Sequence, residues 1–353
     1  MEMATVFYHS GWKTPLVHIN AGDGWYDLPL SSTARCFWFS VTFPVPSRFV
    51  FTDGAGHWDN PALQCTNVIG RNYSLTEPGR YAGYKGDIIR LREGGRPVLL
   101  ITDLDGTLLE ERNPVAEAAT LRFARYWLQN HYFTGSRLVY STGRSLEEFQ
   151  MLKVPLLEPD LLITCVGSDA YTMDSEGCYQ AREDYIKLLS SEPWDTTQVS
   201  SLLDERFPWL VKPDARLDFR FKTWRMAQVT DLADHEAELK EFLRQPESVP
   251  PFKVHISGKG DLRYLDFTPI CGGKRAGVRF CKSFFGFGDL ETLIAGDSGN
   301  DLSMLRGVER AVLPANRQDD VDAWFHKKPR GEHKYISDQF FADAIVEALQ
   351  KLE

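Results

Sequence analysis

The stretch that most restricts the fold of this chain is Leu99 to Glu110, which reads LLITDLDGTLLE. Its apolar run is typical of a buried strand, and it ends at Asp103 and Asp105, two like charges. In an open α/β sheet, ligands bind beyond the carboxyl ends of the strands, where these two carboxylates are expected to emerge. Because hard oxygen ligands suit Mg²⁺, the pair predicts a magnesium site; the alternative is a plain Asp-Gly turn after a strand.

From Val98 onward, apolar runs alternate with amphipathic segments. The runs VLLITDL, RLVYSTG and LLITCVG are separated by AATLRFARYWLQNHY and SLEEFQMLK, and the pattern resumes at KVHISG and ETLIAGDSGND. This alternation indicates βαβ units and a doubly wound parallel sheet. Between Asp169 and Val254, strand-like RLDFRFKTWRMAQVT and helical DHEAELKEFLRQ interrupt the pattern, so we expect an insertion in the sheet.

Residues 1 to 90 are rich in aromatic and β-branched residues, in short runs such as ATVFYHS, LVHIN, CFWFSVTF and RFVFTD. Turn-forming residues separate these runs at the spacing of about 8 to 12 residues that is typical of a small β-sandwich. The segment LREGGRP is expected to be a linker, because Gly-Gly and Pro interrupt both periodicities. We therefore predict a multidomain chain with an all-β sandwich at residues 1–92, an α/β Rossmann-like core at 96–165 and 255–353, and an inserted α+β unit at 166–254.

Charge and hydropathy exclude some partners. The formal net charge of -9 argues against nucleic acid as a partner. No apolar run approaches the roughly 18 to 20 residues that cross a bilayer, and MEMATVFYHSGWK lacks the regions of a signal peptide. We expect no membrane partner and an intracellular protein, in the cytoplasm or a plastid.

Three further motifs stand at the ends of apolar runs. They are VYSTGR with Thr142, Gly143 and Arg144, CGGKRAG with Lys274, and LIAGDSGND with Asp297, Asn300 and Asp301. Together with DLDGT, this ordered set resembles the haloacid dehalogenase superfamily of phosphotransferases, over about residues 98 to 353. The alternative is a Rossmann-like domain with incidental acidic turns.

The resemblance implies an aspartyl-phosphate mechanism. Asp103 would attack phosphorus, and Asp105 would serve as general acid and base. Thr142 and Lys274 would hold the phosphoryl oxygens, and Thr107 would steady the loop. The implied Mg²⁺ ligands are Asp103, the carbonyl of Asp105, and Asp297. Phosphate or substrate contacts are expected from Thr142, Gly143, Arg144, Asn300, Asp301, Gly167, Ser168 and Asp169.

Within that superfamily, STGRS, ITCVGSDAY, AGDSGNDLSML and VLPANRQDDVDAWF resemble the sucrose-6-phosphate phosphatases. The resemblance implies hydrolysis of sucrose 6-phosphate or a related disaccharide phosphate. It also implies that the insertion acts as a cap that contacts the sugar and sets the substrate specificity. A family pattern of Lys followed by Gly is replaced by Lys274-Arg275, and the cap sequence departs from the family. Phosphates of trehalose or glucosylglycerol therefore remain open as substrates.

The N-terminal stretches TVFYHSGWKTPLVHINAGDGWYDLP, FVFTDGAGHWDNP and NYSLTEPGRYAGYKG resemble starch-binding modules of carbohydrate-binding family twenty-five. The resemblance implies that His18, Trp25 and Trp58 form a platform for starch or another α-glucan, since flat aromatic faces stack on glucose rings. The alternative is a fibronectin-like sandwich with a core tryptophan, and Trp38 within CFWFSV is the expected core residue.

Together these features predict a Mg²⁺-dependent sugar phosphatase that its N-terminal module tethers to an α-glucan. Two alternatives remain open. The glucan could itself be the substrate, as phosphorylated starch, or the chain could be a glucan-binding protein without catalytic activity.

Overall fold

The structure, a computed structural model, describes residues 2–154, 156–212, 219–242, 251–258, 260–327 and 333–352. Contacts divide the chain into two units. The first unit comprises Met1–Arg96, Arg125–Gly135 and Met173–Tyr179. The second unit comprises Pro97–Ala124, Ser136–Thr172 and Gln180–Glu353. Within the described ranges, no helix combines the length and the apolar character that a membrane span requires.

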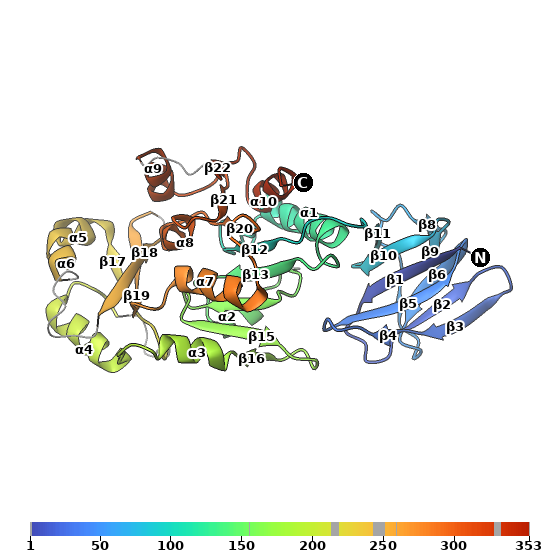
Figure 1. The fold of residues 1–353 in the computed structure, drawn as a ribbon, viewed down its shortest axis with the longest axis horizontal. Coiled ribbons are helices and arrows are strands. Elements are labelled where there is room, and N and C mark those ends of the chain that lie inside the picture. Colours follow the sequence, from blue (N-terminus) through green and yellow to red (C-terminus); the bar gives the residue numbers. More distant parts are fainter. Residues whose placement is uncertain are drawn as a thin grey trace. The chain divides into compact units, whose positions relative to one another are not determined.

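The N-terminal region consists mainly of strands, as the sequence predicts (Figure 1). One sheet has the strand order β11 (Asp87–Arg90), β10 (Gly79–Tyr84), β1 (Met3–His9), β5 (Trp38–Pro44), β4 (Ser31–Ser32). The other has the order β3 (Trp25–Pro29), β2 (Leu16–Asn20), β6 (Ser47–Thr52), β9 (Asn72–Leu75), β8 (Val68–Ile69), and β7 (Trp58–Asp59) pairs with β6.

Both sheets contribute to one hydrophobic core. Alternate residues of β1 and β2, such as Val6 and Val17, are buried in it together with Phe43 and Phe49. Trp38 is 1% exposed, but it lies outside this core. It pairs with His9 on the opposite face of the sheet, where the rings of Tyr132 and Phe133 contact it, so its expected place in the sandwich core is wrong.

The second unit is built on a mainly parallel sheet. Its strand order is β16 (Tyr179–Ala181), β15 (Asp169–Met173), β14 (Leu161–Thr164), β13 (Arg137–Ser141), β12 (Leu99–Thr102), β20 (Thr292–Ala295), β21 (Arg310–Leu313), β22 (Lys334–Ile336). Neighbouring strands from β14 to β22 pair in parallel, whereas β15 is antiparallel to β14. This arrangement confirms the predicted α/β core.

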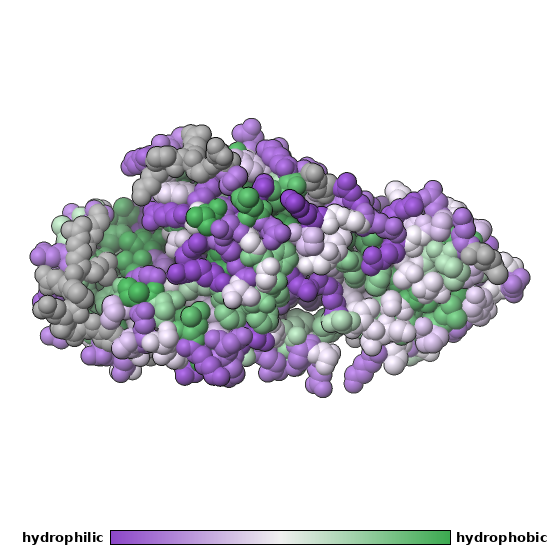
Figure 2. Space-filling view, in the orientation of Figure 1, coloured by the Kyte–Doolittle hydropathy of each residue, from purple (hydrophilic) through white to green (hydrophobic). Residues whose placement is uncertain are grey.

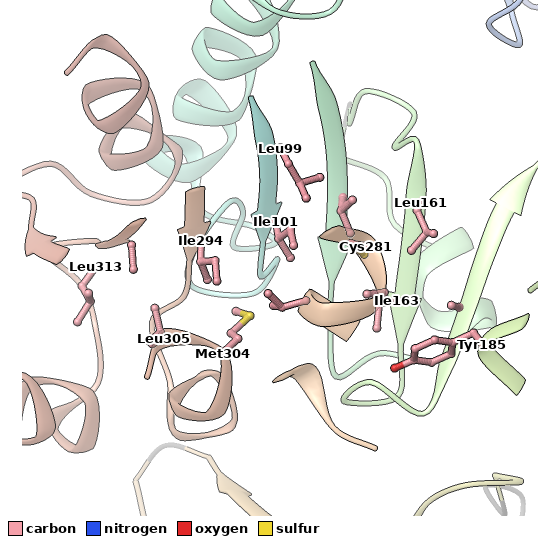
Figure 3. Packing of buried hydrophobic residues seen from close by; sticks show 14 of the residues in the cluster. Leu99, Ile101, Leu161, Ile163, Tyr185, Cys281, Ile294, Met304, Leu305 and Leu313 are labelled. Atoms are coloured by element: carbon pink, nitrogen blue, oxygen red, sulfur yellow. The ribbon is translucent and has the colours of Figure 1, made fainter. Parts of the chain in front are cut away.

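Helices connect and cover these strands. They are α1 (Pro114–Asn130), α2 (Leu146–Gln150), α3 (Glu183–Leu189), α7 (Lys274–Phe285), α8 (Leu302–Leu305), α9 (Asp319–Lys327) and α10 (Ala342–Gln350). Leu99 and Ile101 of β12 belong to a core with Cys281 of α7 and Met304 of α8 (Figure 3). Leu100 is also fully buried, and strand alternation directs it to the opposite face of the sheet.

The insertion forms a small antiparallel sheet with the strand order β17 (Thr223–Gln228), β19 (Leu262–Pro269), β18 (Phe252–Ser257). Its helices are α4 (Thr196–Arg206), α5 (Val229–Asp234) and α6 (Glu236–Phe242). Part of RLDFRFKTWRMAQVT lies outside the described residues.

Two expected boundaries of the insertion differ from this topology. The expected start at residue 166 precedes β15 and β16, which continue the core sheet. The expected end at residue 254 falls inside β18, which pairs with β19 and so extends the small sheet to Pro269. The loop between β18 and β19 is too short for a parallel crossover, which needs about a dozen residues, so the two strands form a hairpin.

Candidate active site

Three carboxylates converge at the carboxyl ends of β12 and β20. Asp103 follows β12, Asp297 follows β20, and Asp301 ends the 3-10 helix η1 (Gly299–Asp301). One oxygen of each lies within 4.8 Å of the others, and all three residues are buried. The ends of neighbouring parallel strands share one edge of a sheet, which explains why residues distant in sequence meet here. Such a cluster of oxygen atoms fits a hard divalent cation.

Gly106 lets the loop after β12 pass close to this acidic cluster. Its φ is +83°, and a Cβ there would lie 2.4 Å from Asp297 Oδ2. Thr107 Oγ1 donates a hydrogen bond to Asp297 Oδ1 at 3.2 Å. Asn316 Nδ2 donates to the Gly106 carbonyl at 2.6 Å, and its Oδ1 accepts from the backbone N–H of Phe341 at 2.9 Å. Asn316 was not among the predicted site residues, and its one signal in the sequence is its place just after the apolar run AVLPA.

Lys274 begins α7, and its buried ammonium offsets part of the negative charge of the acidic cluster. Nζ lies 2.6 Å from Asp103 Oδ1 and 2.5 Å from Asp301 Oδ1. The pKa of Asp103 is raised to about 7, because burial and the neighbouring Asp301 raise it and Lys274 opposes them only in part. Burial lowers the pKa of Lys274, but the two carboxylates outweigh it, so this pKa lies above its ordinary value.

The side chain of Asp105 forms an ion pair instead of joining the acidic cluster. Arg144 Nε donates to its Oδ2 at 2.7 Å, Arg144 Nη2 donates to its Oδ1 at 2.6 Å, and Arg144 also donates to Glu111 at 3.0 Å. Thr142 is buried, and its Oγ1 accepts from the backbone N–H of Arg144 at 3.1 Å. The structure therefore groups Asp103 with Asp297 and Asp301, and holds the Asp105 carboxylate on Arg144.

Asp103, Asp105 and Arg144 lie in the lining of a cavity of about 720 Å³. Of the residues expected from the sequence, the lining includes Asp103, Asp105, Gly143, Arg144 and Asn300. The inserted unit adds Phe219, Lys222, Trp224, Ser257, Gly258, Leu262, Tyr264 and Asp266, which the sequence analysis did not single out. Alternation in LRYLDFTP was the signal that could have marked Tyr264 and Asp266 as facing away from the core.

Gly167, Ser168 and Asp169 are outside the described lining of this cavity. Gly167 permits a close backbone approach, since a Cβ there would lie 2.3 Å from the carbonyl carbon of Gly273. Ser168 is buried and donates a hydrogen bond to the carbonyl of Phe221 at 3.1 Å. Asp169 begins β15, and burial raises its pKa above the ordinary value.

A separate aromatic cluster lies on the sheet formed by β2, β3 and β6. The rings of His18 and Trp25 are stacked, with centroids 4.9 Å apart and planes at 9°, and Trp58 meets the His18 ring edge-on at 5.5 Å. Trp25 and Trp58 are 41% and 48% exposed. His18 Nδ1 lies 2.6 Å from Asp27 Oδ1, its cross-strand neighbour. The structure thus brings together the three residues expected to bind glucan.

The α/β core of the second unit has the fold of the haloacid dehalogenase-like hydrolases. The solved structure of the sucrose-phosphatase from Synechocystis, in complex with sucrose and phosphate, matches with a TM-score of 0.62 and 24% identity, covering 73% of this chain and 98% of that chain. The sequence model of the family described as sucrose-6F-phosphate phosphohydrolase matches residues 96–353, and the chain belongs to this family.

Two curated relatives extend this similarity. A probable sucrose-phosphatase 3a from Arabidopsis thaliana is 25% identical over 280 residues, which are 73% of this chain and 60% of the relative. A mannosylfructose-phosphate phosphatase from Agrobacterium fabrum is 25% identical over 71% of this chain and 95% of the relative. The chain therefore spans 60% of the length of the plant protein that it matches.

Proposed function

We propose that this protein is a Mg²⁺-dependent phosphoric monoester hydrolase that releases phosphate from a sugar phosphate through an aspartyl-phosphate intermediate. The observation that carries the proposal is the buried contact of Asp103, which lines the 720 Å³ cavity, with Lys274, beside Asp297 and Asp301. A nucleophilic carboxylate that faces an anionic substrate needs neighbouring positive charge, which Lys274 supplies.

The chemistry would proceed in two displacements. The Asp103 carboxylate attacks phosphorus, the bond from phosphorus to the sugar oxygen breaks, and Asp105 protonates the leaving alkoxide. Water then attacks the aspartyl-phosphate, Asp105 accepts its proton, and the Asp103 carboxylate and inorganic phosphate are released. Thr142 and Lys274 would orient the phosphoryl oxygens. Since both Asp105 oxygens accept from Arg144, Asp105 exchanges this partner for the substrate oxygen before it acts.

Asp103, Asp297 and Asp301 would hold the cation, because their oxygens lie within 4.8 Å of one another. Bound Mg²⁺ would supply positive charge that offsets the repulsion between the nucleophile and the phosphate. This set adds the Asp301 carboxylate to the ligands that the resemblance implies, and a contribution from the Asp105 carbonyl remains part of the proposal. Asn300, which lines the cavity, would contact the phosphate or the metal's water ligands.

The substrate would be sucrose 6-phosphate or a related disaccharide phosphate. Family membership and the name of the Agrobacterium relative, which acts on mannosylfructose phosphate, both support a disaccharide. The inserted unit, which lines the cavity together with the core, supports a small sugar phosphate more than a polymer.

Phosphate release from a panel of esters tests this function. The panel holds sucrose 6-phosphate, mannosylfructose phosphate, trehalose 6-phosphate, glucosylglycerol phosphate and phosphorylated starch, each with Mg²⁺ and with a chelator. We expect rapid, Mg²⁺-dependent turnover of one disaccharide phosphate, which Asp103→Asn abolishes. Phosphate release from starch alone would favour the glucan phosphatase. No phosphate release from any ester would favour a glucan-binding protein without catalytic activity.

We further propose that residues 1–92 bind starch or another α-glucan and keep the enzyme at its surface. The support is geometric, since the rings of His18, Trp25 and Trp58 lie together on neighbouring strands of one sheet, with both tryptophans exposed and His18 half-buried. Starch pull-down should retain the wild type and lose Trp25→Ala and Trp58→Ala. Tyr26→Ala is the matched control, because Tyr26 is equally exposed at 41% but pairs with Ile19 on the other face of β3. Equal retention of all variants would contradict this role. An intracellular location, in the cytoplasm or a plastid, remains part of the proposal.

A further inference from the structure

A second cavity, of about 430 Å³, lies at one edge of the sheet formed by β11, β10, β1, β5 and β4. β11 is the edge strand, and the lining includes residues of β10, the last residue of β11 and the residues that follow it. Figure 2 shows hydrophilic side chains over β10 and β11. Every residue of the described lining belongs to the first unit, and none of them lines the 720 Å³ cavity. The cavity is therefore separate from the catalytic residues.

Positive charge dominates the lining of this second cavity. Arg80, Arg90 and Arg92 line it, against one acidic residue of the described lining, Glu93. Three positive charges therefore face one negative charge, in a chain whose formal net charge is -9. A local excess of positive charge attracts an anion even where the protein as a whole is acidic. The lining is thus suited to an anionic ligand, which the composition of the chain does not predict.

Two of these arginines are available to a ligand at little cost. The described part of the chain contains no ion pair of Arg80, whose guanidinium lies 5.1 Å from the centre of the Phe7 ring. Arg90 pairs with Glu77, but the two side chains are 55% and 65% exposed. An exposed pair of this kind contributes little free energy, so an anionic ligand can take the place of Glu77. Binding at Arg80 and Arg90 therefore breaks no buried ion pair.

A phosphate monoester of a sugar matches this lining in charge, geometry and size. A monoester carries about -1.5 to -2 charges at pH 7, which the excess of two positive charges balances. Each guanidinium can donate two parallel N–H bonds to two oxygens of the phosphate. Because small-molecule sites typically have about 300 to 1,000 Å³, the cavity has room for a sugar ring beside the phosphate. The amide side chains of Gln129 and Asn130, also in the lining, suit the hydroxyls of such a ring.

We propose that this cavity binds the phosphate monoester of a sugar, with Arg80, Arg90 and Arg92 as its phosphate ligands. Two sources share this chemistry. The monoester is either a free sugar phosphate or a phosphate group on an α-glucan chain. The inference goes beyond the proposed function, because these three arginines take no part in the hydrolysis and the site lies in the first unit.

Titration calorimetry with glucose 6-phosphate tests the site. The parent protein is the whole chain with Asp103→Asn, so that the probe is not consumed. In this parent, Arg80→Gln and Arg92→Gln should each weaken binding at the second cavity about tenfold, since each removes hydrogen bonds to a charged group. Arg92→Lys keeps the charge and should lose less affinity. Any binding of the probe in the catalytic cavity is common to all these proteins, so the difference between them reports on the second cavity.

Arg71→Gln in the same parent is the matched control. Arg71 is an exposed arginine of the first unit, in the turn between β8 and β9, and it is outside the described lining of the cavity. This variant should bind glucose 6-phosphate like the parent. Because the measurement is of binding, it gives a result whether or not the chain hydrolyses any ester, so its failure is distinguishable from failure of the proposed function.

Retention on phosphorylated starch, and on the same starch after removal of its phosphate, distinguishes the two sources. If the monoester belongs to the glucan, the parent prefers phosphorylated starch, and Arg80→Gln and Arg92→Gln lose this preference. If the monoester is a free sugar phosphate, the two variants bind glucose 6-phosphate more weakly, and every protein is retained equally by both starches. The inference is overturned if Arg80→Gln, Arg92→Gln and Arg71→Gln match one another in calorimetry and on both starches.

Discussion

Replacing Lys274 with methionine tests whether the buried carboxylates depend on its charge. Nζ lies 2.6 Å from Asp103 and 2.5 Å from Asp301, with no exposure of the lysine to solvent. At an effective dielectric constant of about 20, each contact is worth about 6 kcal/mol of Coulomb energy before the cost of burying the lysine. Removing one partner of a buried pair typically costs about 3 to 5 kcal/mol, because a buried charge is left uncompensated. We expect a loss of this size in the unfolding free energy of metal-free protein near neutral pH.

The loss should grow with pH. The folded pKa of Asp103, about 7, lies above its ordinary value of 3.8, so folding binds a proton between these values and wild-type stability falls as pH rises through this window. Lys274 lowers the folded pKa, so Lys274→Met raises it further. Above pH of about 7 the wild-type carboxyl is already ionised, whereas the variant continues to lose stability. The difference between the two proteins should therefore widen above neutral pH.

Urea unfolding of metal-free protein on both sides of neutral pH measures this effect. Lys187→Met is the matched control, because Lys187 is an exposed lysine on α3. It should unfold like the wild type at every pH, and Lys274→Met should unfold at lower urea concentrations. The reasoning is refuted if Lys274→Met and Lys187→Met share one midpoint at each pH. Lys274→Met should also lower kcat by about 10²- to 10³-fold in the presence of Mg²⁺, as for other groups that stabilise developing charge.

Three further substitutions test the surroundings of the site. Gly106→Ala places a Cβ 2.4 Å from Asp297 Oδ2 at φ +83°, so thermal unfolding should show a loss of about 1 to 3 kcal/mol and Mg²⁺-dependent stabilisation should weaken. Asn316→Ala leaves the Gly106 carbonyl and the Phe341 N–H without this partner, and urea unfolding should show a loss of about 1 to 3 kcal/mol. Ser145→Ala removes the capping box of α2 and should lower the unfolding free energy by about 1 kcal/mol. KM for the sugar phosphate should be unchanged, and a changed KM would mean that α2 contributes to substrate binding.

Much of the core could be predicted from local patterns. The apolar run at Leu99 to Thr102 and the alternation of runs and helices identified the parallel sheet, because burial on both faces leaves a continuous apolar signature. Asp103, Lys274 and Asp297 could be identified since each follows or begins an element at the same edge of the sheet. The N-terminal strands were equally clear from their alternation, and His18, Trp25 and Trp58 meet because their strands pair.

Contacts between distant segments could not be predicted in this way. The pattern of residues 252–257 is compatible with a core strand, and only its pairing with β19 assigns it to the inserted sheet. The side chain of Asp105 was expected to serve as general acid and base, and no pattern in the sequence indicated that Arg144 would hold it in an ion pair. In the same way, Trp224 and Tyr264 could have been core residues, since alternation says which residues share a face but not what that face meets.

By itself, then, the sequence determined the elements, the residues at the strand ends and the family of residues 96–353, because each of these depends on short-range periodicity or on ordered motifs. The tertiary structure decided which carboxylates share a cation site, which partner holds Asp105, and which face of the inserted sheet closes the cavity. These outcomes depend on the path that the chain takes between distant segments. That path is selected by the packing free energy of many non-local contacts, which no short stretch of sequence contains.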